Sequence, residues 1–224
     1  MTIISFAYKL ADEVIFMNYK DYQQARDAAW RILIDCGVRE LPVKVVKICR
    51  EIGIAVFSYE KGRSIIERFN LLDHMDRTDG FTIFPDEPTI FYDGNMLNAR
   101  CRFTIAHELG HLVLGHIQCG QVTAINRDPM PGDDPQETAA NQFAARLLAP
   151  ACVLWGMKLH NAEDIAKTCG ISQQAATFRA QRMELLYQRE QRFLRERGRS
   201  CFLMSPYERQ VYARFKEYID QRSG

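Results

Sequence analysis

An apolar run from Phe103 to Ile117 constrains the fold of this chain more than any other feature of its sequence. The run is fifteen residues long, which is long for a strand, so we predict a buried helix. Histidines and Glu108 interrupt the apolar residues. Ionisable groups are costly to bury unless something pairs with them. The run therefore predicts a buried helix that carries a polar site.

Three of these polar residues, His107, Glu108 and His111, form the pattern His-Glu-x-x-His. Residues four apart lie on one face of a helix, so both imidazoles can bind one metal ion. Glu108 follows the first histidine, where its carboxylate can accept a proton from a water on the metal and pass it to a leaving amine. The pattern therefore predicts a metallopeptidase site. Two alternatives are histidines that only make hydrogen bonds, and a structural metal, which usually has four protein ligands.

A catalytic metal of this kind needs a third protein ligand. The candidates are the aspartates of a long loop and four other residues: His74, His116, His160 and Glu137. We choose Glu137, because it begins a helix after a loop long enough to bring that helix back across the first. The residues that follow on its helix are small enough for close packing: Ala140, Ala144 and Ala145. We interpret His116 as a residue that supports the site or caps the first helix.

The rest of the chain is predicted to be mostly helical, with a small sheet before the His-Glu-x-x-His helix. Apolar spacing, caps, prolines and glycines predict these helices: 21–36, 42–53, 137–148, 162–168, 172–187 and 206–221. The predicted strands, of which the last two form a hairpin, are 54–59, 81–84 and 89–93. Residues 60–78 are mixed and charged, and we assign no element to them. A loop rich in glycine and proline is predicted at 119–136. The fold class predicted is α+β.

Composition excludes several classes of protein. The net charge is +1, so no overall field attracts nucleic acid or an anionic membrane, and such a contact would need a local patch. The seven cysteines are scattered without a Cys-x-x-Cys pair, which is typical of reduced thiols in a cytosol. The N-terminal residues do not resemble a signal peptide, and no stretch is apolar enough to span a membrane. We therefore expect a cytoplasmic protein.

The segment from Arg179 to Arg199 holds seven arginines against three glutamates. Its simplest interpretation is a solvated helix face with mixed charges. A docking surface for an acidic partner is the next, and a DNA-binding regulator, with a helix pair around Gly170 and Ser172, is a third. The helix predicted after this segment, 206–221, has an apolar stripe that must pack within the chain or in a dimer.

Two stretches of the sequence resemble the ImmA/IrrE family of bacterial and phage metallopeptidases: RFTIAHELGHLVLGH (102–116) and ETAANQFAARLLAP (137–150). The family joins His-Glu-x-x-His to a downstream E-x-x-A-N/D-x-F-A. LPVKVVKICREIGIAVFSYE is similar to the family's N-terminal helix and first strand, and AEDIAKTCGISQQAATFRAQRM to its helix-turn-helix-like end. The resemblance covers about 20–187, so we predict a metallopeptidase domain at 1–187 and an Arg-rich helical extension at 188–224.

The resemblance implies a zincin-like fold and a function. It implies that His107, His111 and Glu137 bind the metal and that Glu108 is the general base. Zinc is the expected ion, and manganese is compatible with two imidazoles and a carboxylate. Family members cleave helix-turn-helix transcriptional repressors, so the expected substrate is a repressor of the same cell, mobile element or prophage, with no direct contact to nucleic acid or membrane. A scaffold that binds metal without proteolysis is the alternative.

Overall fold

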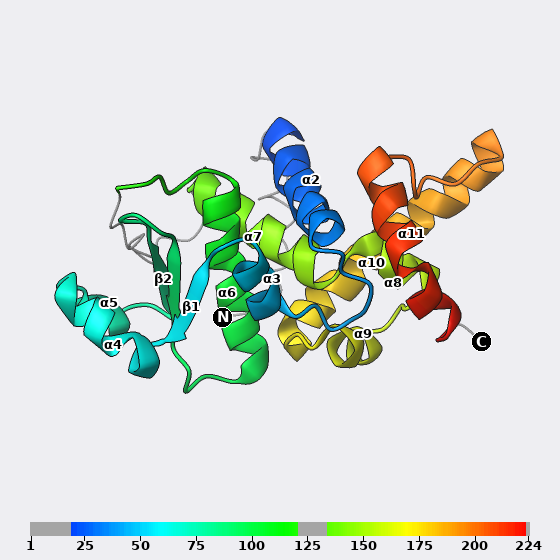
Figure 1. Cartoon of the computed structure of the whole chain (residues 1–224). Helices are drawn as coiled ribbons and strands as arrows, with labels where there is room; N and C mark the ends of the chain where they lie inside the picture. The colour runs from blue at the N-terminus through cyan, green and yellow to red at the C-terminus, as the bar shows by residue number, and fades with distance from the viewer. Residues whose placement is uncertain (1–18, 121–133, 223–224) are drawn as a thin grey trace. The chain divides into compact units, whose positions relative to one another are not determined.

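The computed structural model describes residues 19–120 and 134–222 (Figure 1). The expectations for the N-terminal residues 1–18 and for most of the predicted loop, 121–133, lie outside these ranges. The chain forms two units, which are described separately. Unit 1 contains the residues up to Ala28 and Lys44–Ala144, and unit 2 contains Ala29–Val43 and the residues from Ala145 onward.

Unit 1 contains a sheet of three short strands, β1 (Ala55–Ser58), β2 (Gly80–Ile83) and β3 (Thr89–Tyr92). Their order is β1-β3-β2. β1 is parallel to β3, with Phe57 opposite Phe91. β2 is antiparallel to β3, with Thr82 opposite Ile90. The predicted hairpin of β2 and β3 is therefore confirmed, and β1 pairs with β3 on its other side.

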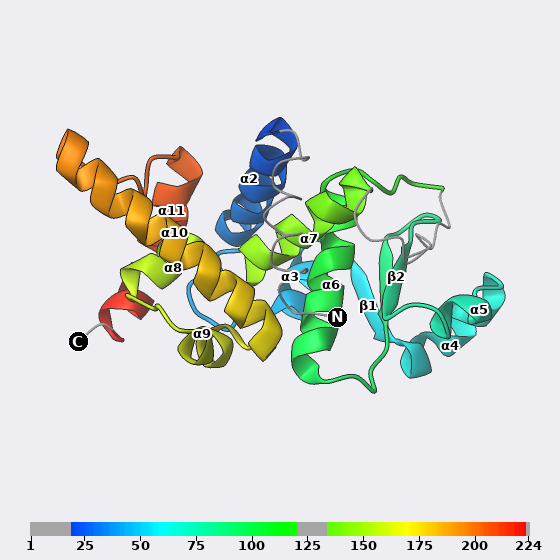
Figure 2. The same ribbon diagram turned by 180° about the vertical axis from the view of Figure 1, so that it is seen from behind.

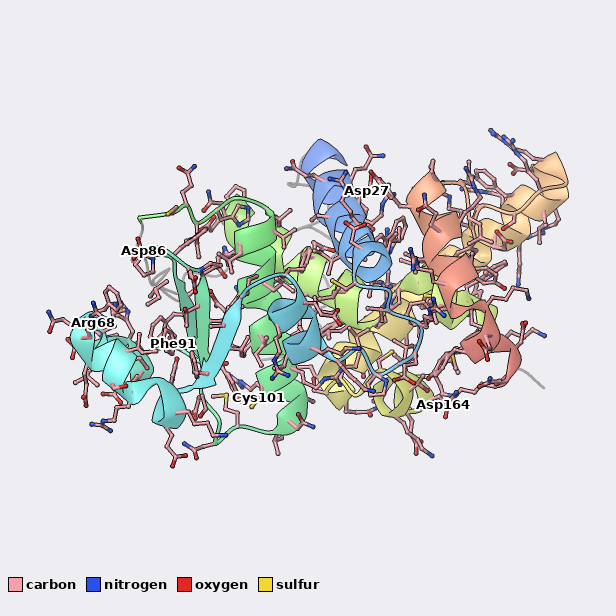
Figure 3. All side chains as sticks on the ribbon, viewed as in Figure 1. Asp27, Arg68, Asp86, Phe91, Cys101 and Asp164 are labelled. Carbon is pink, nitrogen blue, oxygen red and sulfur yellow. The ribbon has the colours of Figure 1, made fainter. Side chains whose placement is uncertain are left out.

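The sheet lies between α4 (Tyr59–Arg68) and α6 (Asn98–Val113), as Figure 1 shows. Successive side chains of a strand point to opposite faces. Phe81 and Ile83 belong to the apolar cluster that includes Tyr59 and Ile66 of α4. Phe91, labelled in Figure 3, joins the same cluster. The other face of β2 lies against α6.

The prediction for 54–59 ran one residue too far, because Ser58 ends β1 and caps α4. The Ser58 hydroxyl accepts a hydrogen bond from the backbone N–H of Lys61, as expected for a helix N-cap. α4 and the short α5 (Leu72–Met75) occupy the region to which no element was assigned. Two helices that precede the sheet match their predictions to within a few residues: α2 (Tyr19–Asp35) and α3 (Val45–Glu51).

The predicted buried helix exists as α6, but it begins and ends earlier than 103–117. It ends at Val113 because Gly115 adopts a positive φ of 75°, a conformation that terminates helices and suits glycine. The backbone N–H of His116 then donates to the carbonyl of His111 at 2.9 Å. His116 therefore lies just beyond the helix and not on its surface. The next helix, α7, spans Pro135–Leu148.

Unit 2 contains α8 (Ala151–Gly156), α9 (Ala162–Cys169), α10 (Gln173–Arg197) and α11 (Pro206–Asp220). α8 was not predicted. α10 packs against α9 (Figure 2). The predicted cap at Ser172 is confirmed, since its hydroxyl accepts from the N–H of Ala175. α10 continues ten residues beyond the predicted end at 187 and stops at Gly198, which is left-handed.

The apolar stripe of α11 packs within the chain. Val211 and Phe215 are fully buried, and the helix contacts α8, where Tyr212 lies close to Gly156. The segment before α11 is held by Glu190 of α10, which accepts a hydrogen bond from the backbone N–H of Cys201 at 2.6 Å. Burial alone would raise the pKa of Glu190, but hydrogen bonds from this segment outweigh burial and lower it.

The predicted fold class is confirmed, since the described residues form a mostly helical α+β structure with one small sheet. All seven cysteines have free thiols, and four of them are buried. Among the described residues, no helix is both long and apolar enough to cross a membrane.

Candidate metal site

α6 places His107, Glu108 and His111 in the interior of unit 1. Their exposed fractions are 2%, 4% and 1%, values that ionisable side chains reach only when they are paired or bind a metal. The Nε2 atoms of His107 and His111 lie 3.0 Å apart. The spacing of four residues therefore brings both ring nitrogens to one point, as the sequence predicted.

α7 brings Glu137 to the same point from its first turn. The Oε2 atom lies 3.3 Å from Nε2 of His107, and Oε1 lies 3.2 Å from Nε2 of His111. The three side chains form the only cluster of potential metal ligands found in 19–120 and 134–222. The structure thus brings together all three residues that were predicted as ligands.

The close approach of α7 to α6 depends on small residues. A Cβ at Gly110 would lie 3.2 Å from Cα of Ala140 and 3.0 Å from Cδ1 of Phe143, both tighter than ordinary contact. Ala140 and Ala144 are fully buried. Gly110 lies one residue before His111, and Ala140 lies one turn after Glu137. The contact between the helices therefore sets the distance between the carboxylate and the histidines.

The positions of the two Nε2 atoms and of the Glu137 carboxylate fit a divalent metal. Zinc binds imidazole nitrogen at about 2.0–2.1 Å in tetrahedral sites, which places neighbouring ligand atoms about 3.4 Å apart. Here the two Nε2 atoms lie 3.0 Å apart, Nε2 of His111 lies 3.2 Å from Oε1 of Glu137, and Nε2 of His107 lies 3.3 Å from Oε2 of Glu137. Oε1 of Glu137 is buried and has no hydrogen-bond donor among the described residues. A cation between the two Nε2 atoms and the Glu137 carboxylate would supply the missing partner.

Asn141, one turn after Glu137, determines which nitrogen of His107 carries the proton. Its Oδ1 lies 2.9 Å from Nδ1 of His107, and a carbonyl oxygen only accepts, so Nδ1 must donate. Nε2 of His107 is then the ring nitrogen that can bind a metal. This arrangement is typical of a metal-binding histidine held by a partner on its other nitrogen.

His116 contacts the other histidine of the pair. Its Nδ1 lies 3.1 Å from Nδ1 of His111. Burial, followed by the nearby His111, lowers the pKa of His116 to about 4. At neutral pH it is uncharged, so it can share a proton with His111 without adding positive charge beside the cluster. Its predicted supporting position is observed, but the turn at Gly115 produces it.

The pKa of Glu137 is also perturbed. Burial alone would raise it, but His107 and His111 together outweigh burial and hold the pKa of this carboxyl well below its usual range. Glu137 is therefore an anion at neutral pH. Two imidazoles and one carboxylate form a donor set that zinc and manganese both accept.

A comparison with protein families identifies the group to which this site belongs. The family model described as IrrE N-terminal-like domain, a peptidase family, matches residues 47–187, more than half of the chain. The chain belongs to this family. The comparison with curated proteins found no match. The match confirms the resemblance seen in the sequence, and it shows a metallopeptidase of the IrrE N-terminal-like family.

The other residues considered as third ligand lie elsewhere in this IrrE-like chain. His74 packs on Phe81, 5.8 Å between ring centroids, in the apolar layer on the α4 face of the sheet. His160 belongs to unit 2, where it stacks on Tyr187 at 4.2 Å. Asp128 and Asp133 of the loop lie outside the described residues, whereas Asp134 is exposed, accepts a hydrogen bond from the backbone N–H of Gln136 and is not part of the cluster.

Sequence reasoning missed two contacts of the site. The contact of Asn141 with His107 could have been suspected, because Asn141 follows Glu137 by four residues and shares its helix face. The second contact is a hydrogen bond from Thr82 to Glu108. No local pattern indicates it, because Thr82 lies in an ordinary strand 26 residues away along the chain.

Proposed function

We propose that the chain is an endopeptidase in which His107, His111 and Glu137 bind zinc and Glu108 is the general base. The convergence of the two Nε2 atoms and the Glu137 carboxylate, at distances of 3.0–3.3 Å, is the observation that carries this proposal. Manganese is the alternative ion, since the donor set suits both. The family match supports the metal-dependent peptidase class.

The bound metal would supply a Lewis acid that makes water more acidic and polarises the scissile carbonyl. Glu108 follows the first ligand on the same helix, and its carboxylate would accept the proton from the attacking water. The water oxygen then bonds to the carbonyl carbon. When the carbon–nitrogen bond breaks, Glu108 returns the proton to the leaving amine. His107 and His111 stay neutral ligands, held by Asn141 and His116.

The substrate we propose is a helix-turn-helix transcriptional repressor of the same cell, mobile element or prophage. The resemblance to ImmA/IrrE peptidases supports this choice. We also propose a cytoplasmic location, which the scattered free cysteines support. The division into a catalytic domain, 1–187, and an Arg-rich extension, 188–224, remains part of the proposal.

Neither alternative function gains support from the structure. A DNA-binding regulator would need exposed arginines at the start of α10, but Arg179 is 6% exposed and donates to the backbone carbonyl of Ala149. A scaffold without proteolysis would not need Glu108, which is present and buried beside the histidines.

Metal analysis of the purified protein tests the ligand set. The wild type should hold about one metal ion per chain, and Glu137→Ala should lose it, because removal of one of three ligands weakens a site far more than a change beside it. Glu163→Ala, at an exposed position of α9, is the matched control and should keep its metal. Full metal content in Glu137→Ala would place the third ligand elsewhere.

Cleavage of purified helix-turn-helix repressors from the same organism tests the reaction. Glu108→Gln should abolish cleavage and keep the metal, because the amide cannot accept a proton from water. If Glu108→Gln still cleaves, the proposed base is wrong. If the metal-loaded wild type cleaves none of the repressors but degrades another protein, the substrate class is wrong and the peptidase assignment stands.

A further inference from the structure

Both β2 and β3 of the sheet in unit 1 contact the catalytic helix, and β2 does so through one face. A Cβ at Gly80 would collide with Cγ2 of Thr104, and two residues later Thr82 contacts Glu108. Two residues of a strand span about 6.6 Å, and four residues of a helix rise about 6 Å. The two spacings match, so β2 runs alongside α6 and holds this register over both contacts.

The contact between Thr82 and Glu108 is a buried hydrogen bond. The hydroxyl of Thr82 donates to Oε2 of Glu108 at 2.9 Å. Thr82 is 1% exposed and Glu108 is 4% exposed. A buried carboxylate is costly without donors, and a hydrogen bond to a charged group is among the stronger ones in proteins. The neighbours of Thr82 on β2, Phe81 and Ile83, belong to the apolar layer on the opposite face.

Thr82 restricts the side chain of Glu108 through this hydrogen bond. Glutamate has three side-chain torsions, and the rigid helix fixes only its Cα and Cβ. The hydrogen bond attaches one carboxylate oxygen to the sheet, whose strands pair with each other and not with α6. The position of the carboxylate relative to His107 and His111 is thus determined from two sides, by α6 and by β2.

We propose that Thr82 is a positioning residue, which holds the Glu108 carboxylate in the orientation needed to accept a proton from the attacking water. This inference rests on the proposed role of Glu108 as general base. Thr82 does not contact the ligand atoms of the metal cluster. Its removal should therefore slow the chemical step and leave metal binding intact.

The test compares Thr82→Val with Thr82→Ser. Valine keeps the shape of threonine and removes the hydroxyl, whereas serine keeps the hydroxyl and removes a methyl group. Thr82→Val should lower kcat for repressor cleavage by about 10- to 100-fold, the range typical of residues that support a catalytic group. KM and metal content should stay at their wild-type values. Thr82→Ser should retain most of kcat, and a merely structural role would instead affect both variants alike.

Urea unfolding of the metal-free protein supplies a second measurement that does not depend on activity. We compare the wild type, Thr82→Val, Glu108→Ala and the double variant. Thr82→Val should lower the unfolding midpoint when Glu108 is present and should have no such effect when residue 108 is alanine. Equal effects in both backgrounds would show that the hydrogen bond between Thr82 and Glu108 does not stabilise the protein, and would refute the inference.

The outcomes separate this inference from the proposed function. Wild-type kcat in Thr82→Val, beside an inactive Glu108→Gln, would refute the positioning role and leave the peptidase mechanism in place. Retained cleavage by Glu108→Gln would refute the mechanism itself, and with it any catalytic role of Thr82.

Discussion

Replacement of Gly110 by alanine tests whether the spacing of α6 and α7 controls metal binding. The added Cβ would lie 3.0 Å from Phe143 and 3.2 Å from both Cα and the carbonyl oxygen of Ala140, where ordinary contacts are 3.4–4 Å. The Phe143 ring can rotate slightly, but the Ala140 atoms belong to the backbone of α7. The helix must therefore move by a few tenths of an ångström.

This displacement is comparable to the tolerance of a metal site. Metal–ligand distances in proteins vary by only about 0.2 Å, and Ala140 lies one turn from Glu137 on the same rigid helix. We expect metal affinity to fall by about 10- to 100-fold, as for other changes beside a metal site. Overpacking lowers the free energy of unfolding by about 1–3 kcal/mol, and replacement of a helical glycine by alanine raises it by about 1 kcal/mol. The free energy of unfolding of the metal-free protein should therefore fall by at most about 2 kcal/mol.

Two measurements check this expectation. Titration against a competing chelator gives the zinc dissociation constant, and urea unfolding of the metal-free protein gives its stability. Glu137→Ala supplies the control, since Gly110→Ala should cause no further loss of affinity once the carboxylate is absent. If Gly110→Ala binds zinc as tightly as the wild type, the helix contact does not position Glu137 and the reasoning is refuted.

Two further predictions concern contacts on either side of the site. Asn141→Ala should lower zinc affinity by about 10- to 100-fold, because His107 loses the acceptor that fixes its tautomer, and the same chelator titration measures it. Glu190→Gln should destabilise the protein by about 1–3 kcal/mol in urea at neutral pH, because a charged acceptor of the Cys201 N–H is lost. The folded-state pKa of Glu190 is lowered, so its contribution is complete above the ordinary carboxyl pKa and disappears as the pH falls through the lowered value. The two proteins should therefore converge in strongly acidic solution.

The sequence predicted those parts of the site that depend on helical periodicity. The histidine pair needs only one helix and a spacing of four residues, so His107 and His111 were identified before the structure. Glu137 required a second argument, in which a long connection returns a helix rich in alanine across the first. The structure brings Glu137 close to the two histidines, as that argument requires, because Gly110 and Ala140 are small enough for close approach.

Other parts of the structure depend on contacts that are distant along the chain. α4 was missed because charged residues surround a narrow apolar stripe, of which Tyr59, Gly62 and Ile66 are buried. Thr82 was missed because its partner lies 26 residues away. His116 was correctly assigned a supporting position, but a helix surface was assumed where Gly115 in fact turns the chain back.

The two kinds of proposed ligand should respond differently to mutation. The distance between His107 and His111 is set by the repeat of one helix, which substitutions elsewhere in the core change little. Glu137 approaches from another helix, so its distance depends on the packing between α6 and α7, and a buried interface adjusts only partly to a change in volume. Substitutions at this interface should therefore weaken metal binding more than equally destabilising substitutions in the apolar cluster around Phe81. Metal affinity and overall stability would then vary independently across such variants, because the third ligand depends on one local contact.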